Sequence, residues 1–96
     1  MIDPVRTREG IISYLKEYFP DDIDQLLLLD GFDDAFVGVM TAFGSKVAAA
    51  YDTEKIIEKL MSDSMDYEDA VEYFEFNIIG AYVGEHTPVF LNIMRG

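Results

Sequence analysis

The sequence contains no cysteine among its 96 residues. This absence excludes disulfide bonds, thiolate metal sites and cysteine nucleophiles, and it fits a reducing compartment. No apolar run approaches the ~20 residues that a membrane-spanning helix needs. The N-terminal stretch MIDPVRTREG also lacks the apolar segment of a signal peptide. We therefore expect a cytoplasmic protein that does not enter a membrane.

Basic residues are scarce: seven lysines and arginines stand against 19 aspartates and glutamates, for a net charge of −12. No base lies between Lys16 and Lys46, and none lies between Lys59 and Arg95. Such a surface repels phosphates and anionic membranes, so we expect neither direct nucleic-acid binding nor membrane binding. It would attract a partner with a basic surface. Alternatively, the acidity only keeps a hydrophobic domain soluble.

Motifs that carry chemistry are few. His86 is the only histidine, and its neighbours Glu85 and Thr87 would suit a general base. A loop histidine at the end of a helix is the simpler interpretation, since no nucleophile elbow is present. Neither glycine-rich phosphate motif occurs. We predict no enzyme, no catalytic residue and no cofactor.

Three carboxylates gather in the segment DGFDD, namely Asp30, Asp33 and Asp34. Calcium and magnesium take carboxylate oxygens, so this segment could hold a hard cation. The calcium-loop pattern is absent, however, and a solvated turn explains the residues as well. We predict no metal site and interpret these carboxylates as part of a contact surface for a partner.

The N-terminal third suggests two helices. The first begins at Asp3-Pro4 or at the competing cap Thr7, and it ends before Pro20, since the residue before a proline avoids the α conformation. A second helix is predicted from Pro20 to Asp30. Residues 26–29, which read LLLL, could equally form a short buried strand, because periodicity does not separate the two.

The middle of the chain predicts a β-hairpin, with strands at 35–43 and 46–51 and a Gly44-Ser45 turn. Gly38 inside the first strand indicates a bulge or a close backbone approach. The rival interpretation is a helix over 34–43 that ends at Gly44. A short helix then follows, capped by Asp52 or Thr53. Its inward residues are predicted to be Ile56, Ile57, Leu60 and Met61.

A strand after Pro88 could pair with the hairpin. The expected fold is therefore one α+β domain over residues 1–96, in which a small antiparallel sheet, made of the hairpin and the C-terminal strand, packs against three to four helices.

The last predicted helix runs from Asp66 to Gly84, with Asp69 in a position like that of a capping box. Its core face comprises Tyr67, Ala70, Val71, Phe74, Ile78, Ala81 and Tyr82. The opposite face carries Glu68, Glu72 and Glu75, and it continues into an apolar set of Phe76, Ile79 and Val83. A helix that is apolar all round is buried all round. This half is either the spine of the domain or the contact with a second copy or a partner.

Three segments, LLLLDGFDDAFVGV, AYDTEKIIEKLM and YEDAVEYFEFNIIGAYVGEHTPVF, resemble a family of small proteins encoded in tailed-bacteriophage genomes. The resemblance covers about two thirds of the chain, from Leu26 to Leu91, and the string EYFEFNIIGAYVGEHTPVF is its specific part. The family has no assigned reaction, cofactor or catalytic residue. The resemblance thus implies only a phage origin and expression in a bacterial cytoplasm, where small phage proteins commonly bind host machinery.

Two functions fit these observations. The first is a non-enzymatic module that docks on a host or phage protein. One version of it imitates part of a DNA duplex, because helical carboxylates three or four residues apart lie ~5–6 Å from each other. The alternative is a homo-oligomer that binds or sequesters a small ligand. The predicted partner surface comprises Glu68, Glu72, Glu75, Asp30, Asp33 and Asp34, and the predicted apolar contact comprises Phe76, Ile79 and Val83.

Overall fold

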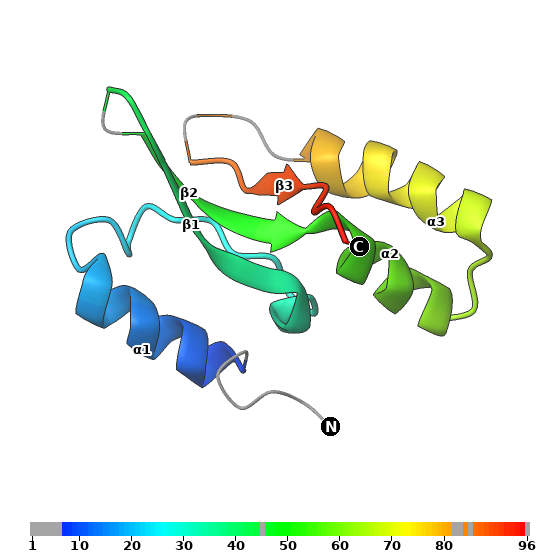
Figure 1. Cartoon of the computed structure of the whole chain (residues 1–96), viewed down its shortest axis with the longest axis horizontal. Helices are drawn as coiled ribbons and strands as arrows, with labels where there is room; N and C mark the ends of the chain where they lie inside the picture. The colour runs from blue at the N-terminus through cyan, green and yellow to red at the C-terminus, as the bar shows by residue number, and fades with distance from the viewer. Residues whose placement is uncertain (1–6, 45, 82–83, 85, 96) are drawn as a thin grey trace.

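The hairpin forms the centre of the fold. A computed structural model describes residues 7–44, 46–81, 84 and 86–95. Strand β1, Phe36–Ala42, pairs antiparallel with β2, Lys46–Asp52, as the blue-green and green arrows of Figure 1 show. The prediction of a hairpin rather than a helix over 35–43 is confirmed. Phe43 lies beyond the last pair, Ala42 with Lys46, and belongs to the connection.

The predicted irregularity at Gly38 is a β-bulge. The register of the pair shifts between Phe36 and Gly38, and Gly38 has a φ of 152°. Gly44 in the connection has a φ of 85°. Both values lie where a side chain would be strained, so glycine suits both positions. The predicted Gly44-Ser45 turn is not tested, since Ser45 lies outside the described residues.

The third strand corrects one prediction. Strand β3, Val89–Leu91, joins the sheet beside β2 as expected, but it runs parallel to β2, so the sheet is mixed rather than antiparallel. The reason lies in the connection. Between β2 and β3 the chain passes through two helical segments before it returns, and a crossover of this kind brings a strand back in the same direction. The α+β fold itself is confirmed.

Helix α1, Arg8–Tyr18, begins at the second of the two predicted caps. The hydroxyl of Thr7 accepts a hydrogen bond from the backbone N–H of Gly10 at 3.1 Å. The helix ends at Tyr18, with Phe19 as its C-cap directly before Pro20, so the predicted end before Pro20 is confirmed. The other predicted start, Asp3-Pro4, lies outside the described residues.

The predicted second helix over 20–30 is wrong. The backbone N–H groups of Asp22 and Ile23 donate to the carbonyl of Phe19, and two later N–H groups donate to Asp22, so two turns form and no helix propagates. Residues 26–29 are neither helix nor strand; Leu26 and Leu29 are buried. The N–H of Leu29 donates instead to a side-chain hydroxyl 22 residues away in sequence, so a tertiary contact replaces the helical hydrogen bond.

Helix α2, Thr53–Ser62, is capped by Asp52, whose carboxylate accepts hydrogen bonds from the N–H groups of Glu54 and Lys55. Three of its predicted inward residues are buried, namely Ile56, Ile57 and Leu60. The fourth, Met61, is 41% exposed, so that prediction is wrong. It lies on the flank of the helix, where an open groove begins.

Helix α3, Tyr67–Tyr73, is capped by Asp66, which accepts a hydrogen bond from the N–H of Asp69 at 2.8 Å. It continues as a π-helical segment, η3, Phe74–Ile78, and a 3₁₀ turn, η4, Ile79–Ala81. Of the predicted core face, Ala70, Phe74 and Ile78 are buried and Val71 is half-buried. Tyr67 and Ala81 are exposed, so the core face is narrower than predicted. Tyr82 lies outside the described residues.

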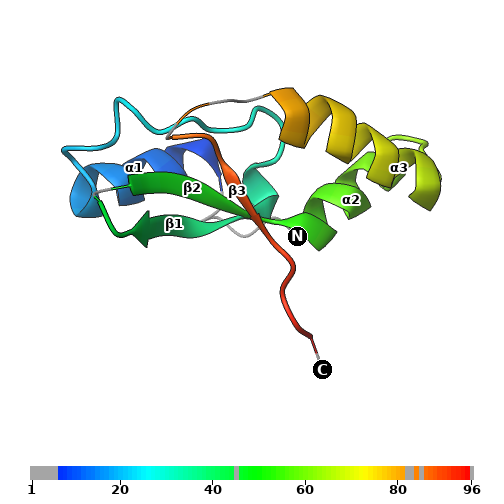
Figure 2. The same ribbon diagram turned by 90° about the horizontal axis from the view of Figure 1, so that it is seen from above.

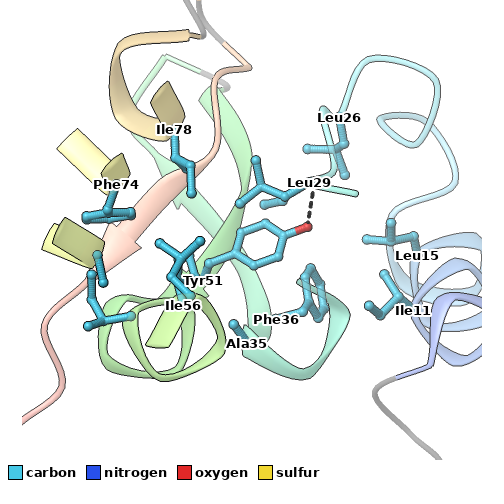
Figure 3. Packing of buried hydrophobic residues seen from close by; sticks show 14 of the residues in the cluster. Ile11, Leu15, Leu26, Leu29, Ala35, Phe36, Tyr51, Ile56, Phe74 and Ile78 are labelled. Atoms are coloured by element: carbon cyan, nitrogen blue, oxygen red, sulfur yellow. Dashed lines mark hydrogen bonds between the residues drawn. The ribbon is translucent and has the colours of Figure 1, made fainter. Parts of the chain in front are cut away.

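The core is built around Tyr51 (Figure 3). Its side chain is fully buried, and its ring lies edge-on to Phe36 at 5.7 Å and near Phe90 at 6.5 Å. Its hydroxyl accepts the hydrogen bond of the Leu29 N–H at 2.9 Å. Helices α1 and α3 approach from either side of this ring. A single aromatic residue on β2 therefore joins both helices and the 26–29 segment.

Figure 2 shows how the layers are arranged. Helices α1 and α3 and the segment that follows α1 lie on one side of the sheet, and the C-terminal residues 92–95 extend from the other. A 3₁₀ turn, η2, Asp33–Ala35, leads into β1 beside α2. Among the residues that the structure describes, no helix has the length and apolar content needed to cross a bilayer.

Candidate functional site: the outer face of helix α3

The predicted acidic surface on the last helix is present. Glu68, Glu72 and Glu75 are all exposed, on a helix whose buried residues are Ala70, Phe74 and Ile78. The sequence places no base between Lys59 and Arg95, so these carboxylates have no cation on their own helix. Their spacings of four and three residues keep them within reach of one another. The result is a concentration of negative charge over a short helical surface.

Phe76 lies exposed among these carboxylates. Its side chain is 72% exposed, and Ile79, one turn further on, is 44% exposed. The interpretation of this half-helix as a spine buried on all sides is therefore wrong. The sheet and the other helices contact only one side of it, through Phe74 and Ile78. Val83, the third member of the predicted apolar contact, lies outside the described residues.

A shallow groove runs beside Phe76. Its lining residues come from the start, middle and end of the helical segment: Met65, Asp69, Glu72, Tyr73, Phe76 and Asn77. The groove has a volume of about 540 Å³, and Tyr73 on its wall is 41% exposed. Apolar side chains thus share the groove with carboxylates. Met65 and Asn77 were not predicted as site residues. Met65 precedes the cap of α3 and Asn77 is an isolated amide, so neither belongs to a repeating sequence pattern.

The π-helical segment lies directly under this surface. The N–H of Ile79 donates to the carbonyls of both Glu75 and Phe74, so the helix is one residue wider at this turn. A π turn inside a helix changes the direction of the side chains that follow it and is frequent at functional sites. Here it coincides with Phe76, the most exposed aromatic residue of the helix. The helical periodicity of the sequence does not reveal it.

The second predicted acidic cluster is not brought to this face. The guanidinium of Arg8 donates to the carbonyl of Leu29 at 2.8 Å and lies 3.0 Å from Asp33 and 3.4 Å from Asp30. Two of the three aspartates therefore lie beside the cationic side chain of Arg8. These contacts hold residues 29–33 against α1. Asp34 lines a separate hollow together with residues of α2. This turn has a structural explanation, and its role as a partner contact stays a prediction.

His86 is engaged in the fold. Its Nδ1 lies 2.8 Å from the carbonyl oxygen of Val47, so the ring donates a hydrogen bond to β2. The histidine thus ties the segment before β3 to the central strand. In the described ranges, no group of three or more histidine, aspartate and glutamate side chains is arranged to hold a metal ion.

The structure contains an ion-pair cluster at the end of β2 that was not predicted from the sequence. Asp52 is 1% exposed; besides capping α2, its carboxylate accepts a hydrogen bond from the guanidinium of Arg95. The other arm of Arg95 lies 2.9 Å from Glu54. The hydrogen bond that Arg95 donates to Asp52 raises the pKa of Arg95 above its ordinary value, so the arginine stays charged. Forty-three residues separate Arg95 from Asp52, and no local pattern predicts the pair.

Comparisons of the chain with protein-family models, with curated proteins and with solved structures give no match. The resemblance to phage proteins therefore stays a prediction from the sequence, and arguments about function rest on the geometry above.

Proposed function

We propose that this protein is a non-enzymatic binding module that presents the outer face of α3 to a basic segment of another protein. The observation that supports the proposal is the exposed aromatic ring of Phe76 beside a groove whose rim includes Asp69 and Glu72. Aromatic residues in such settings commonly supply the central contact of a protein interface. The resemblance to phage proteins makes a protein of the host bacterium the expected partner.

The charges define the chemistry of that partner. Carboxylates around an apolar centre suit a segment that places an apolar side chain against Phe76 and lysines or arginines against Glu68, Glu72 and Glu75. Opposite charges of this kind accelerate association and orient the partner, and salt screens them. The groove is open and elongated along the helix, as an amphipathic helix or an extended strand would require.

The same face argues for docking rather than duplex mimicry. Phosphates follow one another along a DNA strand every ~3.4 Å of rise. Along α3 and its continuation, exposed Tyr73 lies between Glu72 and Glu75, and exposed Phe76 and Ile79 follow them. A surface that only imitated phosphates would gain nothing from these apolar side chains. We therefore place apolar contact at the centre of the interface and electrostatics at its rim.

The test is an affinity capture from a nuclease-treated bacterial lysate with the tagged protein and three variants. Phe76→Ala removes the ring, and Glu72→Gln combined with Glu75→Gln removes two rim charges. Glu17→Gln, an exposed acid on α1, is the matched control for charge. We expect one stoichiometric basic protein with wild type and with Glu17→Gln, and at least a ~10-fold loss of affinity with Phe76→Ala.

The salt dependence of binding separates the electrostatic contribution to affinity from the apolar one. The wild-type complex is expected to weaken as salt rises, and the Glu72/Glu75 variant is expected to bind weakly with a smaller salt dependence. A partner that Phe76→Ala retains at full affinity contradicts the proposed site. Recovery of the tagged protein alone contradicts the proposed function.

A further inference from the structure

A second groove lies between helix α2 and the C-terminal residues 92–95, and it has a volume of about 450 Å³. Figure 2 shows the C-terminal segment leaving the sheet near the start of α2 and diverging from that helix. The groove shares no lining residue with the one beside Phe76. Its lining residues come from α2, the start of α3 and the segment after β3: Glu54, Ile57, Glu58, Met61, Tyr67, Asn92 and Ile93.

The walls of this groove carry exposed apolar side chains. Met61 is 41% exposed, Tyr67 is 63% exposed and Ile93 is 40% exposed. Leu91 and Met94, which flank the lining residues of the C-terminal segment, are exposed as well. Each of the three elements around the groove thus presents apolar area to solvent. Such a concentration of exposed apolar side chains is typical of a contact site.

Carboxylates of α2 border these apolar side chains. Glu54 and Glu58 line the groove and lie one helical turn apart. The two lysines of α2, Lys55 and Lys59, line a different hollow, which Glu58 also borders, and neither of them lines this groove. Among the described residues, no ion pair joins Glu58 to a lysine or an arginine. The groove therefore combines apolar walls with a carboxylate that no ion pair neutralises.

The structure shows which kind of cation this side of α2 accepts. The guanidinium of Arg95 donates a hydrogen bond to the buried carboxylate of Asp52, and its other arm lies 2.9 Å from Glu54. A planar guanidinium can bridge two carboxylates in this way, whereas an ammonium presents one charged point. These contacts also hold the C-terminal segment in place, so that Ile93 forms one wall of the groove. Arg95 is thus a positioning residue for the groove.

We propose that this groove binds an arginine-containing segment of a partner protein. The segment places its arginine against Glu58 and an apolar side chain between the walls of α2 and the C-terminal segment. Charge favours this occupant over a second copy of the chain, since each copy has a net charge of −12. The apolar walls favour it over a free cation. The inference extends the proposed function, because it gives the basic partner a second point of contact.

The experiment is an NMR titration of the full, isotopically labelled chain with a capped synthetic peptide of alternating leucine and arginine. Binding is expected to shift the backbone amide signals of Met61, Tyr67 and Ile93, with a dissociation constant below about 1 mM. The same peptide with lysine in place of arginine is expected to bind about 3-fold more weakly, because an ammonium does not reproduce the geometry of a guanidinium.

Two variants test the named contacts. Met61→Ser removes part of an apolar wall and is expected to raise the dissociation constant at least ~5-fold, and Glu58→Gln removes the charge and is expected to raise it about 3-fold at low salt. Both residues are exposed, so both variants are expected to fold, and the amide spectrum checks this. The matched controls are Leu27→Ser and Glu17→Gln, exposed residues outside the groove that are expected to leave binding unchanged.

The peptide can also enter the groove beside Phe76, so Phe76→Ala separates the two sites. Losses with Met61→Ser and Glu58→Gln, and none with Phe76→Ala, support the inference even where the face of α3 captures no partner. A loss with Phe76→Ala alone overturns the inference and leaves the proposed function standing. Absence of binding up to about 1 mM peptide, or equal losses in the control variants, overturns the inference as well.

Discussion

The outer face of α3 and the side of the sheet that points away from Tyr51 differ in exposure and in charge. Around Phe76 the chain places Glu68, Glu72 and Glu75, all exposed. On that side of the sheet Ala48 and Ala50 are 0% and 5% exposed, and the sequence has no aspartate or glutamate from residue 35 to residue 51. Apolar composition by itself therefore does not identify a contact surface. The exposure of the apolar side chains and the charges around them decide together whether a surface suits a basic segment.

The largest expected difference is between the two sides of the sheet. Tyr51→Ala should lower the free energy of unfolding by about 3–5 kcal/mol, since it leaves a cavity in the core and removes the acceptor of the Leu29 N–H. Met40→Ala, on the side of the sheet that points away from Tyr51, should cost about 1 kcal/mol, because Met40 is only half-buried. Urea denaturation monitored by circular dichroism measures both. Equal losses would mean that this second side of the sheet contributes as much to stability as the core around Tyr51.

The second contrast concerns two helix caps. Asp52→Ala should destabilise the protein by about 0.5–2 kcal/mol, because it removes the acceptor for two backbone N–H groups of α2 and the partner of Arg95. Asp66→Ala removes one exposed hydrogen bond at α3 and should cost about 0.5–1 kcal/mol. Thermal unfolding of the two variants side by side checks the order. A larger effect at Asp66 would refute the importance assigned to the Asp52–Arg95 cluster.

The third contrast concerns the acidic face itself. Glu72 has like charges on Glu68 and Asp69, four and three residues before it, and on Glu75, three residues after it, each pair costing about 0.2–0.5 kcal/mol in a helix. Glu72→Gln should therefore raise the free energy of unfolding by about 0.6–1.5 kcal/mol at low salt. Most of this gain should be lost near 1 M salt, where the Debye length is ~3 Å. Urea denaturation at both salts measures it. A stabilisation that persists at high salt would point to a cause other than charge repulsion.

Local patterns predicted the elements whose hydrogen bonds are local. Thr7, Asp52 and Asp66 cap helices because their side chains reach N–H groups two or three residues ahead. Gly38 marks a bulge for the same kind of reason. The structure of residues 20–30 was predicted wrongly, because their backbone N–H groups form hydrogen bonds within two turns and with a tyrosine hydroxyl. The apolar pattern of the sequence reveals neither kind of hydrogen bond. The acidic face of α3 was predictable from spacing, but the exposure of Phe76 was not.

The sequence by itself determined the hairpin, the capped helices and the uneven distribution of charge along the chain, because each depends on residues that are neighbours in sequence. Only the tertiary structure decided that β3 runs parallel to β2, that Arg95 pairs with buried Asp52, and that Phe76 faces solvent. These three depend on contacts between distant segments. One side of α3 is enough to complete the core around Tyr51, and the sheet needs helices on only one of its faces. The side of α3 that the core does not need is left exposed, and the contact proposed for a basic partner lies there.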